Sequence, residues 1–193
     1  MTIVDKPAAS AAPLRRLYFA RFAFALVWAA LLFLTTKSQL GPLGVVLVVG
    51  YPLFDVAAAV VDARSTRAVG LYVNIAISLL AGIGLAVASA SGVPAVLRVW
   101  GAWAVAAGLV QLSVAVGRRE MGGQWPMILS GGISVLAGVN FVLSAGAPAP
   151  SLAAVAGYAV LGGIFFLVSA LRLGRTPVAR GIKDSGSADV RPR

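Results

Sequence analysis

The side chains with chemical potential in this sequence are a few polar residues set inside long apolar runs. The first group consists of Arg21, Asp55, Asn74, Gln111 and Ser130. A charged side chain at the middle of a membrane-spanning helix costs about 2.5–3.5 kcal/mol. A charge in such a run therefore needs compensation, and the open chemistries are ion pairing, hydrogen bonding and proton transfer.

The depth of each residue in its run predicts which of them meet. Arg21 lies about four residues into the first run, and Asp55 lies about six residues from the inner end of the second. An Arg21–Asp55 pair would cancel two charges at once. Asn74, Gln111 and Ser130 fall at similar depth, so we expect a polar layer in the inner half of the bundle.

Three interpretations of this layer remain open. It is a buried ion pair with hydrogen bonds that fixes helix register, or Arg21 snorkels to the interface without a partner. Alternatively it lines a path for protons or small solutes. Nearer the outer side, Arg98 and Asn140 are expected to pair with loop carbonyls or with each other.

Other site chemistries lack their components. The chain has no Cys and no His, which excludes disulfides, thiolate zinc sites and imidazole bases. Of its six acidic residues, only Asp55 lies inside an apolar run. A carboxylate metal cage or an acid–base pair within the membrane would need more. We therefore expect no enzyme activity, no catalytic residue, no cofactor and no metal.

The elements that must position these residues are membrane-spanning helices. Of the 193 residues, 60% are hydrophobic and 11% are charged, against about 25% charged in soluble domains. The apolar runs are each about 20 residues long, enough to cross the hydrocarbon core as a helix, and they do not alternate as strands would. We expect an all-α polytopic membrane protein with spans at 17–34, 40–61, 69–89, 94–116, 125–145 and 151–171.

The basic residues predict the topology. Thirteen of the 16 Lys and Arg residues fall in the two tails or in the loops after the second and fourth runs, whereas the opposite loops hold only Lys37. The positive-inside rule then places both termini in the cytoplasm. A cleaved signal peptide is less favoured, because no small-x-small site follows the first run.

The same distribution indicates the partners. The net charge of +10 is spread where topology signals belong, so nucleic-acid binding is not expected. The lipid bilayer is the expected environment. Residues 1–14 and 174–193 are predicted to be disordered tails, and the basic C-terminal tail could contact anionic lipids. Small-residue helix faces leave a homo-oligomer open.

An internal repeat accompanies the six runs. Tyr51, Trp103 and Tyr158 align at shifts of 52 and 55 residues, and Ser78–Gly82 aligns with Ser134–Gly138 at a shift of 56. A shift of 53 brings the first run into the same frame and sets Arg21 opposite Asn74 and Ser130. Three helical hairpins would then be parallel repeats around an axis along the membrane normal. Similar composition of apolar helices is the alternative explanation.

Pairs of glycines predict where helices approach closely. Gly101 and Gly108 lie seven residues apart, as do Gly131 and Gly138, so each pair occupies one helix face. Because apolar burial does not drive association in lipid, close backbone contact must do so. We interpret these glycines as packing positions.

Three segments, in this order, resemble the HdeD-like family of bacterial acid-resistance membrane proteins: Trp100–Gly108, Arg118–Trp125 and Leu129–Gly138. The Arg in the first helix and the spacing from Tyr51 to Asp55 also fit. Pro52 and Val56 depart from the family pattern. The resemblance covers roughly residues 15–173 and implies a six-helix inner-membrane protein tied to acid or envelope stress, without supplying a mechanism.

Two functions follow from the sequence. The first is a non-enzymatic membrane protein of acid or envelope stress resistance, in which Arg21 and Asp55 are structural. The second is a small-solute or proton transporter or channel through the bundle, in which Asp55 is essential.

Overall fold

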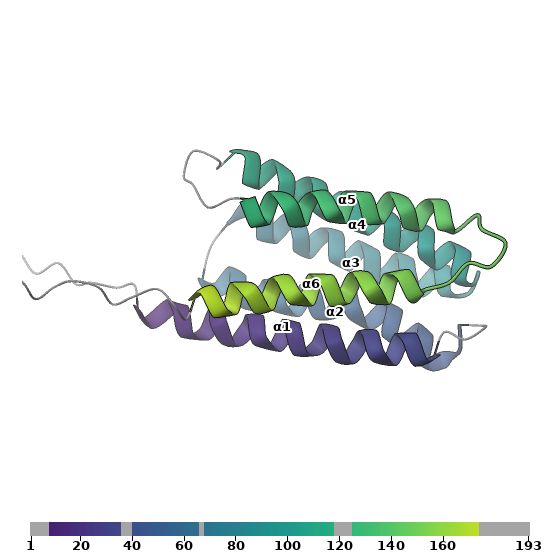
Figure 1. The fold of residues 1–193 in the computed structure, drawn as a ribbon, viewed down its shortest axis with the longest axis horizontal. Helices are drawn as coiled ribbons and strands as arrows, with labels where there is room; N and C mark the ends of the chain where they lie inside the picture. The colour runs from purple at the N-terminus through teal and green to yellow at the C-terminus, as the bar shows by residue number, and fades with distance from the viewer. Residues whose placement is uncertain (1–7, 36–39, 66–67, 118–124, 174–193) are drawn as a thin grey trace, which may run out of the picture.

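The computed structural model describes residues 8–35, 40–65, 68–117 and 125–173, and these form six long helices (Figure 1). No strand occurs within these ranges. All six helices are long and apolar enough to cross a bilayer, so the chain is a multi-pass membrane protein. They are α1 Ala8–Thr35, α2 Pro42–Ser65, α3 Val69–Ser89, α4 Val93–Gly117, α5 Trp125–Ser144 and α6 Ala153–Leu173.

The predicted spans match α3 to α6 within two residues at each end, and the larger departures concern α1 and α2. Residues 8–14, expected in the N-terminal tail, belong to α1, because this segment is rich in Ala, the residue that most favours a helix. Helix α2 continues to Ser65, beyond the predicted end at 61. Residues 1–7 and 174–193 lie outside the described residues, so their disorder stays a prediction.

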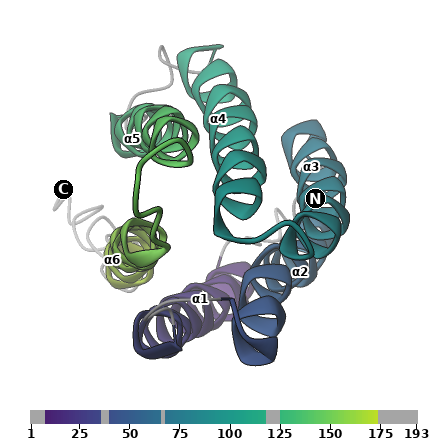
Figure 2. The same cartoon turned by 90° about the vertical axis from the view of Figure 1, so that its right-hand side faces the viewer.

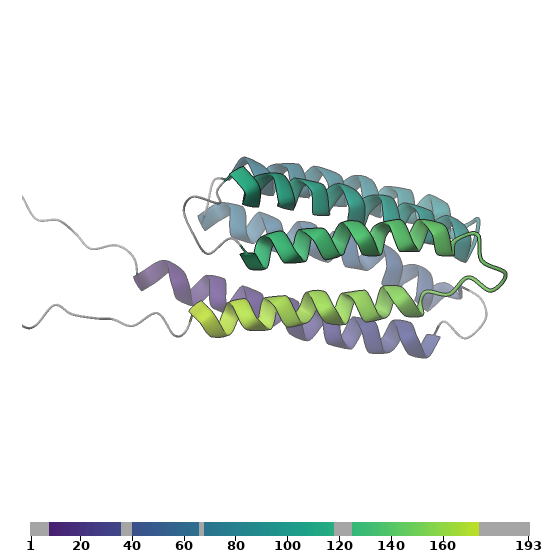
Figure 3. The ribbon, with the colours of Figure 1, turned by 45° about the horizontal axis from the view of Figure 1, so that its top comes forward.

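The helices form a ring when the bundle is seen along its length (Figure 2). The most extensive contacts join α2 to α3, α4 to α5 and α6 to α1. The α6–α1 contact closes the ring and sets the first and last helices side by side (Figures 1 and 3). Because the number of helices is even, α1 begins and α6 ends at the same end of the bundle, which we call the termini end; the other is the turn end.

Helix contacts follow the register of the repeat. A Cβ placed on Gly108 of α4 would lie 3.0 Å from the Cβ of Ser134 on α5. A Cβ on Gly163 of α6 would lie 3.1 Å from the Cβ of Ala25 on α1. These are the same two positions once the shifts found in the sequence are applied. Likewise a Cβ on Gly82 of α3 would lie 3.2 Å from Leu53 of α2, at the repeat positions of Gly138 and Val105. The three large contacts of the ring are therefore variants of one helix–helix interface.

The α4–α5 contact is the tightest variant, because glycines of both helices face each other. A Cβ on Gly138 would lie 2.6 Å from the carbonyl oxygen of Gly101, and a Cβ on Gly131 would lie 3.0 Å from that of Gly108. No side chain fits at such distances without moving the backbone. The four glycines thus have the packing role that their spacing predicts.

The buried core lies in the turn-end half of the bundle. Its largest fully buried apolar side chains come from the turn-end halves of all six helices and from the segment before α6; they include Leu32, Leu85, Leu97, Trp100, Phe141 and Leu152. In the termini-end half the buried apolar side chains are small, chiefly Ala58, Ala59, Ala63, Ala115 and Ala170. The bundle is therefore densely filled at one end and more loosely packed at the other.

Replacing Gly138 with Ala tests the α4–α5 contact. The added methyl group would meet the backbone of α4, and overpacking of this kind costs about 1–3 kcal/mol, more than the gain in helix propensity. We expect Gly138→Ala to lower the melting temperature of the purified protein in detergent by several degrees.

Gly132→Ala on the same helix is the matched control, since nothing lies within 4 Å of its Cβ position. It should melt at or slightly above the wild-type temperature. Equal melting of the two variants would contradict the backbone contact.

Candidate functional site: an intramembrane charge cluster

The carboxylate of Asp55 on α2 is the centre of the candidate site. Arg21 of α1 forms an ion pair with its Oδ1 through Nη2, as the sequence predicts. Asn74 Nδ2 donates to Oδ2 at 2.7 Å and Ser78 Oγ donates to the same oxygen at 2.9 Å. Both are on α3. Asp55 therefore joins three helices, and we call these four residues together with Trp103 the Asp55 cluster.

Two further contacts extend the cluster to the rest of the ring. Trp103 Nε1 of α4 donates to Ser78 Oγ at 3.2 Å, so the serine hydroxyl links α4 to the carboxylate. The guanidinium carbon of Arg21 lies 4.1 Å from the centre of the Phe166 ring on α6, in a cation–π contact. Every helix except α5 thus contributes to the surroundings of this ion pair.

Partial burial makes these contacts strong. The side chains of Arg21 and Asp55 are only 15% and 13% exposed. Charges removed from water interact strongly when paired, and an acceptor as highly charged as a carboxylate is best satisfied by several donors. The pair is neutral as a whole, which lowers the cost of placing it inside a membrane-spanning bundle.

The repeat explains why the cluster forms at one interface. Arg21, Asn74 and Ser130 are equivalent positions, and the structure brings the first two to opposite sides of Asp55. The equivalents of Asp55 in the other hairpins are Ala107 and Gly162, which carry no acceptor. The carboxylate is thus specific to the first hairpin, whereas the repeat itself is common to all three.

Two of the repeats share a hydrogen bond between an uncharged aromatic side chain and a serine hydroxyl. Trp103 donates to Ser78, and at the equivalent positions Tyr158 OH donates to Ser134 Oγ at 2.8 Å. In both cases an aromatic side chain of the even helix reaches the serine of the odd helix in its own hairpin. This shared bond indicates that the hydroxyl–aromatic contact belongs to the repeat itself.

Aromatic rings cover the cluster on the turn-end side. Trp28, Tyr51, Trp100 and Trp103 lie in a continuous group, with ring centres 4.6 to 6.1 Å apart in successive contacts. Trp28 Nε1 donates to the carbonyl of Leu47 at 2.7 Å. The indole N–H of the fully buried Trp100 has no hydrogen-bond partner within the described residues. These rings separate Asp55 from the turn end.

Two of the expected members of the polar layer are placed elsewhere. Gln111 Nε2 donates to the carbonyl of Met127, which ties α4 to α5 away from Asp55. Ser130 contributes its backbone carbonyl to the hydroxyl of Ser134. Within the described residues neither side chain is hydrogen-bonded to Asp55, because equal depth does not place side chains on the same face, and the wider polar layer stays a prediction. On the neighbouring helix α4, the repeat equivalent of Asp55 is Ala107, which offers Ser130 no carboxylate.

Arg98 and Asn140 do not pair with each other. Arg98 and Asn140 are both exposed side chains on α4 and α5, and no hydrogen bond joins them in the described part of the chain. Each is within a few residues of the turn end of its helix. At that depth a long side chain reaches the headgroup region, so Arg98 needs no protein partner.

Sequence reasoning missed Ser78 and Trp103 as members of the cluster. In the sequence, Ser78 and Trp103 stand out only as positions of the internal repeat. A signal was present, because Ser78 lies four residues after Asn74 and so shares its helix face. The repeat also aligned Trp103 and Ser78 with Tyr158 and Ser134.

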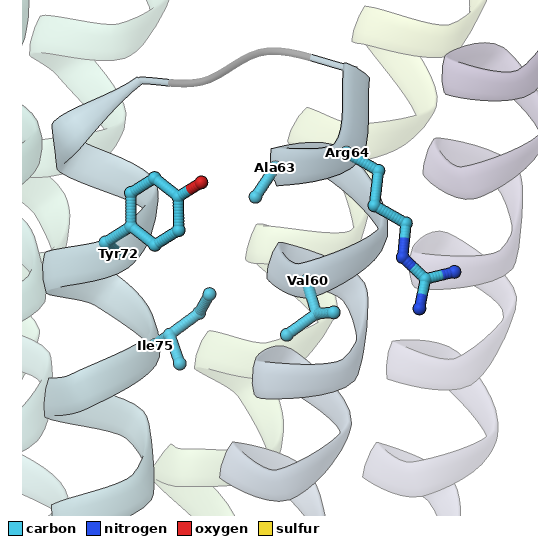
Figure 4. Close-up of a pocket in the computed structure, with 5 residues that line it drawn as sticks. All are labelled: Val60, Ala63, Arg64, Tyr72 and Ile75. Atoms are coloured by element: carbon cyan, nitrogen blue, oxygen red, sulfur yellow. The ribbon is translucent and has the colours of Figure 1, made fainter.

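Two open grooves occur in the termini-end half of the bundle. The first, of about 400 Å³, lies between α2 and α3 and is lined by Val60, Ala63, Arg64, Tyr72 and Ile75. Figure 4 shows Tyr72 and Ile75 facing Val60 and Ala63 across the gap, with Arg64 directed away from it. Ile75 stands at the repeat position of Gly131, and its bulk accounts for the less extensive contact of α2 with α3 than of α4 with α5.

The second groove, of about 380 Å³, lies between α5 and α6. Its lining residues are Trp125, Pro126, Leu129, Ile164, Phe165, Val168 and Arg172. Neither groove is lined by Asp55, Arg21 or Asn74, so both are separate from the cluster.

Comparison with known protein families, with curated proteins and with solved structures found no match to this chain. The site is therefore interpreted from its own geometry.

Removing one partner of the ion pair should destabilise the fold. Asp55→Ala leaves the Arg21 charge uncompensated inside the bundle, and breaking buried pairs in this way costs about 3–5 kcal/mol. We expect little folded protein in the membrane and a strongly lowered melting temperature.

The double variant Arg21→Met with Asp55→Leu removes both charges and should recover most of the lost stability. Asn140→Ala, on an exposed position, serves as the control and should behave as wild type. An Asp55→Ala protein as stable as wild type would show that the ion pair does not hold the helices together.

Proposed function

We propose that this chain is a non-enzymatic integral membrane protein that supports resistance to acid or envelope stress, with the Asp55 cluster as its structural lock. The observation that carries the structural part is the saturation of the Asp55 carboxylate. It accepts hydrogen bonds from Arg21, Asn74 and Ser78, which come from the helices on both sides of α2. A carboxylate held in this way fixes helix register and has little freedom for transfer chemistry.

The packing of the turn-end half supports a structural role of the Asp55 cluster over a conducting path. Trp100, Phe141 and Leu97 have exposed fractions of 2% or less and fill the bundle beyond the cluster. Side chains packed at such density leave no continuous polar route. In this conformation a solute that reached Asp55 from the termini end would meet an apolar barrier.

The stress role rests on the resemblance to the HdeD-like family in the segments Trp100–Gly108 and Leu129–Gly138, together with Arg21 and the Tyr51–Asp55 spacing. The excess of basic residues at the termini end supports a cytoplasmic location for both termini. The resemblance supports a bacterial inner membrane. In this proposal the protein acts as a membrane-embedded scaffold and carries out no reaction of its own.

A second candidate is a proton or small-solute path, and one observation favours it. Arg21 and Asp55 retain 15% and 13% exposure, and they lie toward the loosely packed half of the bundle. A rearrangement of the aromatic group would then have to open the turn-end half. This candidate expects Asp55→Asn to fold normally but to abolish flux in proteoliposomes; unchanged flux would exclude it.

The decisive measurement is survival after acid shock in a deletion strain complemented with matched membrane levels of wild type or Asp55→Asn. The amide keeps an oxygen that can accept from Asn74 and Ser78. If the cluster is structural, Asp55→Asn protein that reaches the membrane should restore survival to within a few-fold of wild type.

The variant Gly132→Ala controls for expression, because its Cβ position is open. Rescue by wild type but not by an equally abundant Asp55→Asn would favour the path. A deletion strain as resistant as its parent, under acid and under detergent or osmotic stress, would refute the stress role itself.

A further inference from the structure

We propose that the groove between α5 and α6 is a binding site for one anionic phospholipid, with an acyl chain along the groove and its phosphate on Arg172. This site is independent of the Asp55 cluster and of the proposed stress role. It lies where α5 begins and α6 ends, which is the depth at which headgroups meet the hydrocarbon in a spanning bundle.

The walls of the groove suit a hydrocarbon chain. Leu129, Ile164, Phe165 and Val168 supply an apolar surface from two helices, and the volume is about 380 Å³. The bilayer is the medium in contact with these helices, so the groove is open to acyl chains. An empty apolar groove would forfeit van der Waals contacts that a chain can restore.

A sequence difference between the second and the third hairpin explains why the groove exists. In the second hairpin a Cβ on Gly70 of α3 would lie 3.3 Å from Val114 of α4, so these helices approach closely near the termini end. The equivalent of Gly70 in the third hairpin is Pro126, which lines the groove. The proline ring occupies space that glycine leaves free. Among the neighbouring pairs in the ring, α5 and α6 make the least extensive contact.

The charge at the mouth of the groove selects an anion. Arg172 is exposed in the last turn of α6. The acidic side chains within the described residues are Asp55 and Asp62, both on α2, whereas α6 packs mainly on α1. No salt bridge to Arg172 occurs in the described part of the chain. A guanidinium can bind a phosphate through two parallel hydrogen bonds.

Neighbouring residues favour a lipid over a second copy of the chain. Trp125 is 78% exposed at the start of α5, the position of an interfacial aromatic anchor. Arg15 and Arg16 are also exposed, near the start of α1, and α1 packs against α6. A symmetric dimer through this face would bring these cations toward their own copies, and like charges oppose that contact. An anionic lipid is attracted by them.

The test uses Trp125 as a reporter in proteoliposomes. The other three tryptophans lie inside the bundle, so the difference between wild type and Trp125→Phe isolates the Trp125 signal. Vesicles of phosphatidylcholine would receive increasing fractions of dibrominated phosphatidylglycerol or of dibrominated phosphatidylcholine. We expect half-maximal quenching at a fraction at least three-fold lower for the anionic lipid.

Arg172→Gln should abolish this preference and Arg172→Lys should keep part of it. Arg64→Gln is the matched control, because it removes one exposed cation from the same end of the bundle at α2 and should leave the preference intact. Equal quenching of wild type by both lipids, or an equal loss of preference in Arg64→Gln, would overturn the proposal. Protection of Trp125 from both lipids together with cross-linking of two chains at α5 would also overturn it, in favour of a second copy.

Discussion

The need to neutralise one carboxylate inside the membrane constrains the rest of this bundle. Asp55 can remain in a spanning helix only with donors close to both oxygens, and these come from α1 on one side and α3 on the other. Helix α2 is therefore fixed in rotation and depth between its two neighbours. The contact of Arg21 with Phe166 carries the same constraint to α6, where the ring closes.

Two of the three large contacts of the ring depend on different interactions at the same repeat positions. Between α4 and α5, facing glycines allow backbone contact, which is the main source of attraction where apolar burial provides none. Between α2 and α3, Val56 and Ile75 occupy the corresponding positions and prevent such an approach. Hydrogen bonds from Asn74 and Ser78 to Asp55 hold this pair instead. Gly82 of α3, at the repeat position of Gly138, still lies close to Leu53 of α2, and the polar contacts compensate for the glycines that Val56 and Ile75 replace.

Hydropathy, glycine spacing and charge were sufficient to predict the six spans, the packing role of Gly101 and Gly138, and the Arg21–Asp55 pair. Each of these depends on the chain's order and on depth along the membrane normal, which the sequence gives directly. The hydrogen-bond partners of Gln111 and Ser130 could not be predicted, because the direction of a side chain around its helix changes by about 100° per residue and depth does not determine it. The effect of Pro126 could not be predicted either, because it depends on how α5 and α6 pack in space compared with α3 and α4, where Gly70 stands at the equivalent position.

The uneven filling of the bundle decides from which side the charge cluster can be influenced. Large rings and Leu side chains close the turn-end half, whereas small alanines and two grooves characterise the termini-end half. Helices separated by small residues or grooves can shift at lower cost than helices locked by interdigitated large side chains. The turn end is thus the rigid part of the ring. A force from lipid or from the aqueous phase at the termini end would act on α2, which carries Asp55, and on α6, whose Phe166 ring contacts Arg21.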